Sequence, residues 1–233
     1  MALPGTKGRR RVYLMRHGHV SYVDPEGMPV DPKTVLLTEA GQAQALAAQK
    51  LLREIEFDRA MCSGMPRTRQ TAKIVLGERD ISLEDNDGFV ELSGGRLSQV
   101  APEEREAAFV YGLERADAEG ERFAGGELFA SFEKRITATF DELILQPDWK
   151  RLLLVCHDAV NRMILSHVCG AGLAGIASFE QDMACINVID IDVIDGRVER
   201  CLIKAVNITP YNTTKDGMYH TSLEEVFKTL FDF

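Results

Sequence analysis

Short apolar runs alternate along this chain with longer segments that carry apolar residues at helical spacing. Residues 12–15, Val-Tyr-Leu-Met, have the β-branched and aromatic content of a buried strand. A helix is expected at about 38–52, with Thr38 as its N-cap. A short strand at about 58–62 and a helix at about 66–75, opened by a proline, follow it. This alternation of strand and helix predicts a parallel sheet.

The middle of the chain departs from this alternation. Residues 81–90 are expected to form a third element that leads to Glu91. The stretch 99–120 is charged and helix-prone, and it resembles an inserted helical cap more than a sheet strand. A long helix is expected at about 127–145, because apolar residues recur there at helical spacing: Phe129, Phe132, Ile136, Phe140 and Leu143.

The second half of the chain returns to strands. Residues 151–156 form a continuous aliphatic run, which is typical of a strand buried on both faces of a parallel sheet. A helix at about 159–168 is expected after it. Two further apolar runs, 184–193 and 198–206, are separated by Asp-Gly and predict a hairpin at the sheet edge.

These elements predict one domain over residues 1–233 with a three-layer α/β/α fold. Its central sheet is expected to be mostly parallel, with an edge hairpin and a helical cap insertion at about 96–125. The C-terminal tail, residues 212–233, is polar and then amphipathic, and we expect it to dock on its own domain.

The charge balance limits the classes of partner. A formal net charge of −9 disfavours a general nucleic-acid or anionic-membrane surface, so neither partner is expected. No stretch approaches the roughly 18 uninterrupted apolar residues of a membrane span, and the first apolar run is too short for a signal peptide. The protein is therefore predicted to be cytoplasmic. Five scattered cysteines without a C-x-x-C pair indicate neither a disulfide framework nor a zinc knuckle.

Basic side chains follow several predicted strands at their carboxyl ends. Arg16 and His17 come after the first strand, Arg67 after the second, and His157 after the aliphatic strand. Because these strand ends meet at one edge of a parallel sheet, the four side chains are expected to surround one point. Guanidinium groups match phosphate oxygens, and a neutral imidazole is a nucleophile. With Glu91 as a candidate proton donor, the pattern predicts a phosphate site that needs neither metal nor cofactor.

Several segments resemble motifs of the histidine phosphatase superfamily, which has the phosphoglycerate mutase-like fold. They occur in the family's order from residue 12 to about residue 212. The matching segments are Leu14-Met15-Arg16-His17-Gly18, residues 37–45, residues 63–72 around Arg67, Phe89-Val90-Glu91-Leu92, Gly126-Glu127, Val155-Cys156-His157 and residues 207–210.

The resemblance implies a role for each matching site residue. His17 would take the phosphoryl group, while Arg16, Arg67 and His157 would hold the phosphate oxygens. Glu91 would protonate the leaving oxygen and later activate the water that hydrolyses the phosphohistidine, so its pKa is expected to be raised. The predicted function is metal-independent hydrolysis of a small phosphorylated metabolite, and a homo-oligomeric state is compatible with the sequence.

Two departures from the family pattern lie close to these residues. Val20 stands where the family usually has a hydroxyl side chain, and we expect Ser21 to supply that phosphate contact instead. Asp158 stands where the family commonly has a glycine after the second histidine. An ion pair with Arg162, four residues further along the helix, is the expected partner for this carboxylate.

Three other functions compete with the phosphatase. A cofactor-dependent phosphoglycerate mutase would share the motifs, although the stretch from Glu91 to His157 is short for that enzyme. A metal-dependent hydrolase would use His17, His19, His157 and Asp158 as ligands. A non-catalytic phosphate-binding scaffold would keep the fold without turnover. The phosphatase is favoured, because a scaffold needs neither nucleophile nor acid.

Overall fold

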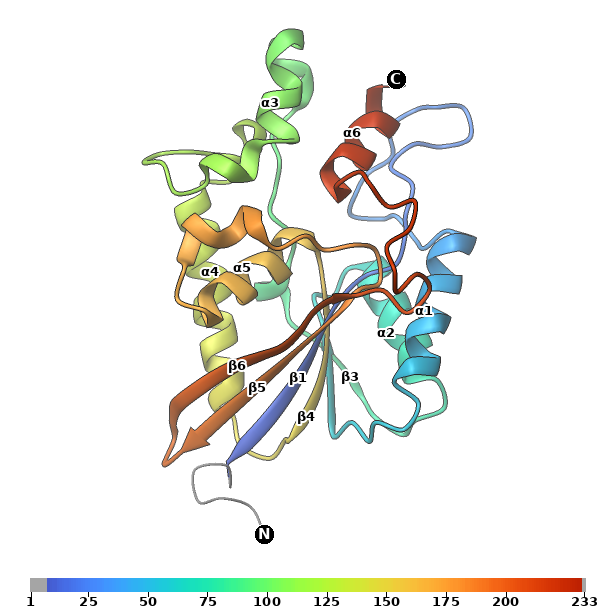
Figure 1. Ribbon diagram of the computed structural model, residues 1–233. Helices are drawn as coiled ribbons and strands as arrows, with labels where there is room; N and C mark the ends of the chain where they lie inside the picture. The colour runs from blue at the N-terminus through green and yellow to red at the C-terminus, as the bar shows by residue number, and fades with distance from the viewer. Residues whose placement is uncertain (1–7, 232–233) are drawn as a thin grey trace.

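The computed structural model describes residues 8–231, which form a six-stranded sheet between two layers of helices (Figure 1). Residues 1–7 and 232–233, at the ends of the predicted domain and tail, lie outside the described residues. The strands are β1 (Arg9–Arg16), β2 (Arg59–Cys62), β3 (Leu83–Asp85), β4 (Arg151–Cys156), β5 (Ile186–Ile194) and β6 (Arg197–Ile208).

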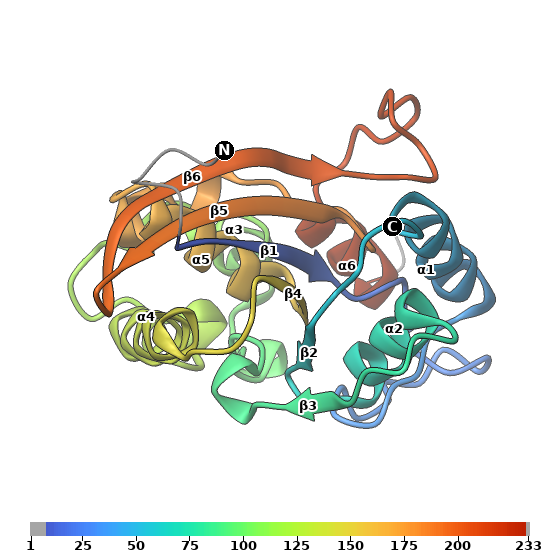
Figure 2. The same ribbon diagram turned by 90° about the horizontal axis from the view of Figure 1, so that it is seen from below.

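The strands are arranged in the order β3-β2-β4-β1-β5-β6, with β3 and β6 at the two edges (Figure 2). The first four in this order are parallel to one another. Strand β5 is antiparallel to both β1 and β6, so β5 and β6 form a hairpin. The predicted α/β fold with a mostly parallel sheet and an edge hairpin is confirmed.

Alternation along β1 separates the two helical layers. Tyr13 and Met15 pack into the apolar cluster that contains residues of α1 and α2. Val12 and Leu14 pack into the cluster that contains residues of α4 and α5. A strand buried on both faces needs this continuous apolar sequence. The helices of the two layers are α1 (Glu39–Leu51), α2 (Pro66–Leu76), α4 (Phe129–Leu145) and α5 (Asp158–Val168).

Strand β1 is longer than the predicted run 12–15, because arginines extend it. Arg9 and Arg11 pair across the sheet with Asp192 and Asp190 of β5, with N···O distances of 2.7 and 2.6 Å. Each arginine lies directly opposite its aspartate in the strand register. These charge pairs keep a polar sequence in the sheet.

The third predicted element, residues 81–90, is mostly not a strand. Only β3 (Leu83–Asp85) pairs in the sheet, and a single 3₁₀ turn, Asp87–Phe89, follows it. Arg135 of α4 donates hydrogen bonds of 2.9 Å to the carbonyls of Gly88 and Val90. The chain is thus fixed in place where it leads to Glu91.

Short helices and the C-terminal helix lie beyond the carboxyl ends of β1 and β4 (Figure 1). Residues 97–125 contain α3 (Arg105–Phe109) and short 3₁₀ helices, and the last described helix is α6 (Ser222–Phe231). Phe109 of α3 and Phe227 of α6 are in contact, with ring centroids 6.2 Å apart. A further 3₁₀ helix, Gly172–Ser178, was not expected from the sequence.

Candidate active site

The loop after β1 lies against the start of α1. A Cβ atom on Gly18 would stand 2.5 Å from the carbonyl oxygen of Gly41, so this close approach requires glycine. Thr38 caps α1 as predicted, since its hydroxyl accepts the N–H of Gly41 at 3.1 Å. The side chain of Gln44 accepts the backbone N–H of His19 at 2.9 Å. These contacts fix the backbone immediately after His17.

His17 follows β1 and is fully buried. Its Nδ1 lies 2.8 Å from the carbonyl oxygen of Gly18, so Nδ1 carries the proton and donates it there. Its Nε2 accepts a hydrogen bond of 3.2 Å from Nε of Arg67. Burial lowers the pKa of His17 well below its usual value, and the charges of Arg67 and Arg16 lower it further. The imidazole is therefore neutral, with its lone pair on Nε2, where Arg67 donates to it.

Arg67 stands between the two histidines. It lies in the first turn of α2, after the turn that follows β2. Its Nη2 is 3.2 Å from Nδ1 of His157, and its Nη1 donates to the carbonyl of Pro32 at 2.6 Å. The ring centroids of His17 and His157 are 5.3 Å apart. The predicted convergence of these side chains is thus present in the structure.

A chain of hydroxyl groups sets the tautomer of His157. Thr68 donates to the carbonyl of Met65 at 2.9 Å, and its oxygen lies 3.0 Å from Oγ of Ser63. Ser63 therefore donates to Thr68 and accepts from Nε2 of His157 at 2.7 Å. Burial holds the pKa of His157 well below its usual value. Ser63 and Thr68 were not expected at the site, although both lie in the motif segment around Arg67.

Arg16 is buried with one N–H unused. Its Nη1 donates to the carbonyl of Gln181, whereas its buried Nε has no partner among the described residues. Burial opposes the charge on this guanidinium, but the nearby Asp158 raises the pKa of Arg16, so it stays cationic. A buried, unpaired N–H on a cation is a strong binding group for an anionic oxygen.

Glu91 reaches the same site from the segment after β3. Its carboxylate oxygens accept the backbone N–H of Leu92 at 2.9 Å and that of Ala159, in α5, at 3.4 Å. Burial raises the pKa of Glu91 to about 7, and the charge of Asp158 acts in the same direction. The expectation of a raised pKa is confirmed, and the group can both donate and accept a proton near neutrality.

Two neighbouring residues of the loop after β1 differ in how their hydroxyls are used. The hydroxyl of Ser21 donates to the carbonyl of Val23 at 2.6 Å, so its proton is used within the loop. The hydroxyl of Tyr22 makes no hydrogen bond to another described residue. Burial raises the pKa of Tyr22, while Arg67 and Arg16 oppose this rise. Tyr22, which the sequence did not single out, is therefore the hydroxyl left available beside the two guanidinium groups.

Asp158 forms the predicted ion pair with Arg162, at 2.8 Å. Its other carboxylate oxygen accepts a hydrogen bond of 3.1 Å from the hydroxyl of Ser222, in α6. His19 is bonded through Nδ1 to the hydroxyl of Thr38. In the part of the chain that the structure describes, no three His, Cys, Asp or Glu side chains form a metal-binding group. The structure therefore does not bring His17, His19, His157 and Asp158 together as one group of ligands.

A cavity of about 350 Å³ opens beside Arg16. Its walls come from the loop after β1, from α1, from the segment before β5, from the segment after β6 and from α6. Among the described lining residues, Arg16 is the only Arg or Lys, and Asp182 and Glu225 are the only carboxylates. The remaining lining residues are His19, Val20, Ser21, Tyr22, Gln44, Met183, Tyr211, Asn212, Gly217, Met218, His220, Ser222, Val226 and Thr229.

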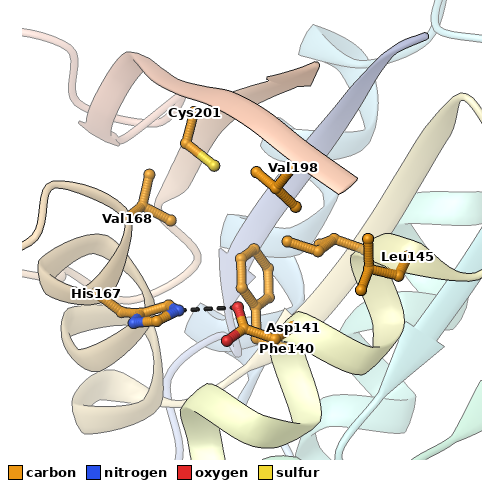
Figure 3. Close-up of a pocket in the computed structure, with 8 residues that line it drawn as sticks. Phe140, Asp141, Leu145, His167, Val168, Val198 and Cys201 are labelled. Carbon is orange, nitrogen blue, oxygen red and sulfur yellow. Dashed lines mark hydrogen bonds and ion pairs between the residues drawn. The ribbon is translucent and has the colours of Figure 1, made fainter. Parts of the chain in front are cut away.

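A second cavity, of about 320 Å³, lies away from these residues, between α4, α5 and β6 (Figure 3). Its polar feature is the pair His167–Asp141, with an N···O distance of 2.9 Å. Phe140, Leu145 and Val198 give it a mainly apolar lining. It contains none of the predicted site residues. No described helix is long and apolar enough to cross a membrane.

Several known proteins are similar to this chain in sequence or in fold. The adenosylcobalamin/alpha-ribazole phosphatase of Salmonella typhi is 30% identical over 186 residues, which cover 78% of this chain and 90% of the relative. The corresponding protein of Salmonella typhimurium strain LT2 is 28% identical over 183 residues, with the same coverage. The crystal structure of the alpha-ribazole phosphatase from Shigella flexneri has the same fold, with a TM-score of 0.67 and 23% identity over 84% of this chain and 96% of that chain.

The model of the histidine phosphatase superfamily (branch 1) matches residues 12–203. This range includes His17, Arg67, Glu91 and His157, and it spans most of the chain. The resemblance noted in the sequence is confirmed. The chain belongs to the histidine phosphatase superfamily.

Proposed function

We propose that this protein hydrolyses a phosphomonoester through a phosphohistidine on His17. The observation that carries the proposal is the state of this side chain. Its Nδ1–H is held by the carbonyl of Gly18, which leaves the lone pair on Nε2 beside the guanidinium of Arg67. A neutral imidazole of this tautomer is the form that attacks phosphorus.

In the first step, Nε2 of His17 attacks phosphorus and the bond from phosphorus to the organic oxygen breaks. Arg16 and Arg67 stabilise the charge on the transferring group, and the N–H groups of Arg67 move from the histidines to phosphate oxygens. When the phosphate dianion binds, it favours the uptake of a proton from solvent by Nδ1 of His157, which then donates to the phosphate while Nε2–H stays hydrogen-bonded to Ser63. This proton returns to solvent when inorganic phosphate leaves. Glu91 gives its proton to the leaving oxygen, and the alcohol departs.

In the second step, the carboxylate of Glu91 takes a proton from a water molecule. The water oxygen attacks phosphorus, the N–P bond breaks, and inorganic phosphate leaves. His17 is again neutral and Glu91 is again protonated, so the cycle closes without a metal or a cofactor. A pKa of about 7 suits Glu91 to both directions of proton transfer.

The charge of the cavity beside Arg16 favours a phosphatase over a mutase. A phosphoglycerate mutase must hold a second anionic group besides the phosphate being transferred. The described lining offers no second cation for such a group, and Glu225 repels it. The substrate is a small metabolite with one phosphate and an uncharged or cationic organic part. Alpha-ribazole 5′-phosphate is the first compound to test, given the relatives. A cytoplasmic location stays a prediction from the sequence.

Phosphoenzyme trapping tests the proposal. The protein is mixed with a ³²P-labelled phosphomonoester and quenched in alkali, in which phosphohistidine survives. Label is expected on the wild type and on Glu91→Gln, whereas His17→Ala is expected to carry no label and to have no turnover. Hydrolysis by His17→Ala at the wild-type rate would refute the proposal. Absence of both label and hydrolysis in the wild type, over a panel of phosphomonoesters, would favour the scaffold instead.

A further inference from the structure

Asp158 is a buried carboxylate in a network that the catalytic scheme does not use. Its two oxygens accept hydrogen bonds from Nε of Arg162 and from the hydroxyl of Ser222. Arg162 also pairs with Glu180, with an N···O distance of 2.7 Å. Glu180 in turn accepts the backbone N–H of Ser222 at 3.0 Å. Two carboxylates thus hold the first residue of α6.

The network retains a surplus of negative charge. Asp158 and Glu180 share the single guanidinium of Arg162, and both Asp158 and Arg162 are almost fully buried. The surplus charge sits on Glu180, whose side chain is 32% exposed. The charge of the buried Asp158 acts on its neighbours because little water screens it. Glu91 lies close to Asp158, because it accepts the backbone N–H of the next residue, Ala159, at 3.4 Å. The charge of Asp158 favours the charged form of Arg16 and the neutral form of Glu91.

The same network supports one wall of the cavity beside Arg16. Ser222, Glu225, Val226 and Thr229 of α6 all line the cavity beside Arg16. The hydrogen bond from Ser222 to Asp158 attaches this wall to the first turn of α5, next to His157. Docking of α6 therefore determines both the shape of the cavity and the exclusion of water from Asp158.

We propose that Asp158 is a positioning residue that joins the C-terminal helix α6 to the proton donor Glu91. One carboxylate then keeps the cavity wall in place and holds the donor in its neutral form. The inference rests on the proposed function, because it assigns Glu91 the role of acid. When α6 is docked, the cavity is closed on this side and Glu91 is protonated. When α6 is released, water reaches Asp158 and weakens its effect on the pKa of Glu91.

Other charged and titratable groups also face Glu91 and affect its pKa. The charges of Arg16 and Arg67 favour its ionised form. Asp158 is the anionic neighbour that opposes them. Tyr22 and Cys156 are further titratable neighbours of Glu91, and burial raises the pKa of both, so they are neutral.

The test compares Asp158→Asn and Ser222→Ala with the wild type. Asparagine keeps the shape of the side chain and removes its charge, so the alkaline limb of kcat/KM should move to lower pH by roughly one unit. Ser222→Ala keeps the charge of Asp158 and removes the hydrogen bond that links α6 to it. KM should rise about 3- to 10-fold, with a smaller movement of the limb in the same direction. Asp141→Asn, at an exposed carboxylate of α4, is the matched control with no movement expected.

A spectroscopic readout separates this effect from a general loss of structure. The ¹³C shift of the Glu91 carboxyl, assigned by its absence in Glu91→Gln, should titrate at lower pH in Asp158→Asn than in the wild type. An unchanged titration and an unchanged limb would overturn the inference. If Asp158→Asn does not fold, Ser222→Ala decides: a raised KM with a moved limb supports the link, and wild-type values refute it. Turnover by His17→Ala would instead refute the proposed function, whatever Asp158→Asn shows.

Discussion

At the scale of single residues, the structure leaves the hydroxyl of Tyr22, and not that of Ser21, available to the phosphate site. Ser21 was expected to supply a phosphate contact, yet its proton goes to the carbonyl of Val23. Tyr22 keeps a hydroxyl without a described partner, in a cavity wall beside Arg16. The hydroxyl that can bind substrate is therefore that of Tyr22, one residue further along the loop than expected.

Replacing Tyr22 by phenylalanine tests this assignment. The loss of one hydrogen bond to a phosphate oxygen should lower kcat/KM about 10-fold, since such a bond to a charged group is worth roughly 1.5 kcal/mol or more. Steady-state kinetics on one phosphomonoester provide the measurement. Ser21→Ala, the adjacent hydroxyl, is the matched control and should stay within about twofold of the wild type. Equal losses in the two variants would contradict the assignment.

At the scale of elements, the chain was most predictable where apolar residues mark the element directly. The runs ending at Met15 and Cys156 indicated β1 and β4 because both faces of these strands are buried. The arginine-rich start of β1 was missed, since its partners Asp190 and Asp192 are supplied by a distant strand. The segment 81–90 was expected as one element, but only Leu83–Asp85 finds a strand to pair with.

The loop after β1 packs closely against α1 at Gly18 and Gly41, and a substitution at Gly18 tests what this contact does. In Gly18→Ala, the new Cβ atom would clash with the backbone of Gly41, so the loop must move away from α1. The carbonyl of Gly18, which holds Nδ1–H of His17, would move with it. We expect kcat to fall at least 10-fold, because small displacements of a reacting group are costly.

The matched control is Gly94→Ala, in which a Cβ atom would meet only the ring of Phe123 at an ordinary 3.6 Å. Its kcat should equal that of the wild type. Thermal unfolding of both variants shows whether stability changes alongside activity. A Gly18→Ala protein with normal kcat would mean that the loop can adjust without moving His17.

At the scale of the whole molecule, burial of Glu91 couples folding to pH. Its pKa of about 7 in the folded protein lies above the value of 4.5 for an exposed glutamate. The folded state therefore holds the proton more tightly, and the stability from this group is complete below about pH 4.5. It is lost as the pH rises to about 7, where the buried carboxylate ionises.

Glu91→Gln should therefore gain stability relative to the wild type as the pH rises from 5 to 8. The gain is expected to level off above about pH 7. Urea unfolding of both proteins at several pH values gives the difference in their free energies of unfolding. In the wild type, the alkaline limb of kcat/KM should fall near the same pH, because the acid of the first step is lost there. A constant difference in stability across this range would show that Glu91 is already ionised at pH 5.

The sequence by itself determined which side chains stand at the strand ends. Arg16, His17, Arg67 and His157 are placed by local features, a buried run followed by a turn or a helix start, and these features are readable without the fold. The family motifs added the expected roles. Such positions are fixed by the backbone, so neighbouring parallel strands bring them together in any sheet of this order.

Only the tertiary structure decided the chemical state of these groups. The tautomer of His157 depends on Ser63, and the proton on Glu91 depends on burial and on Asp158. Asp158 in turn meets Ser222, which is 64 residues away in the chain. Protonation and hydrogen-bond direction depend on the surrounding charges and on the exclusion of water. These come from distant segments, and a sequence pattern carries no record of their distances.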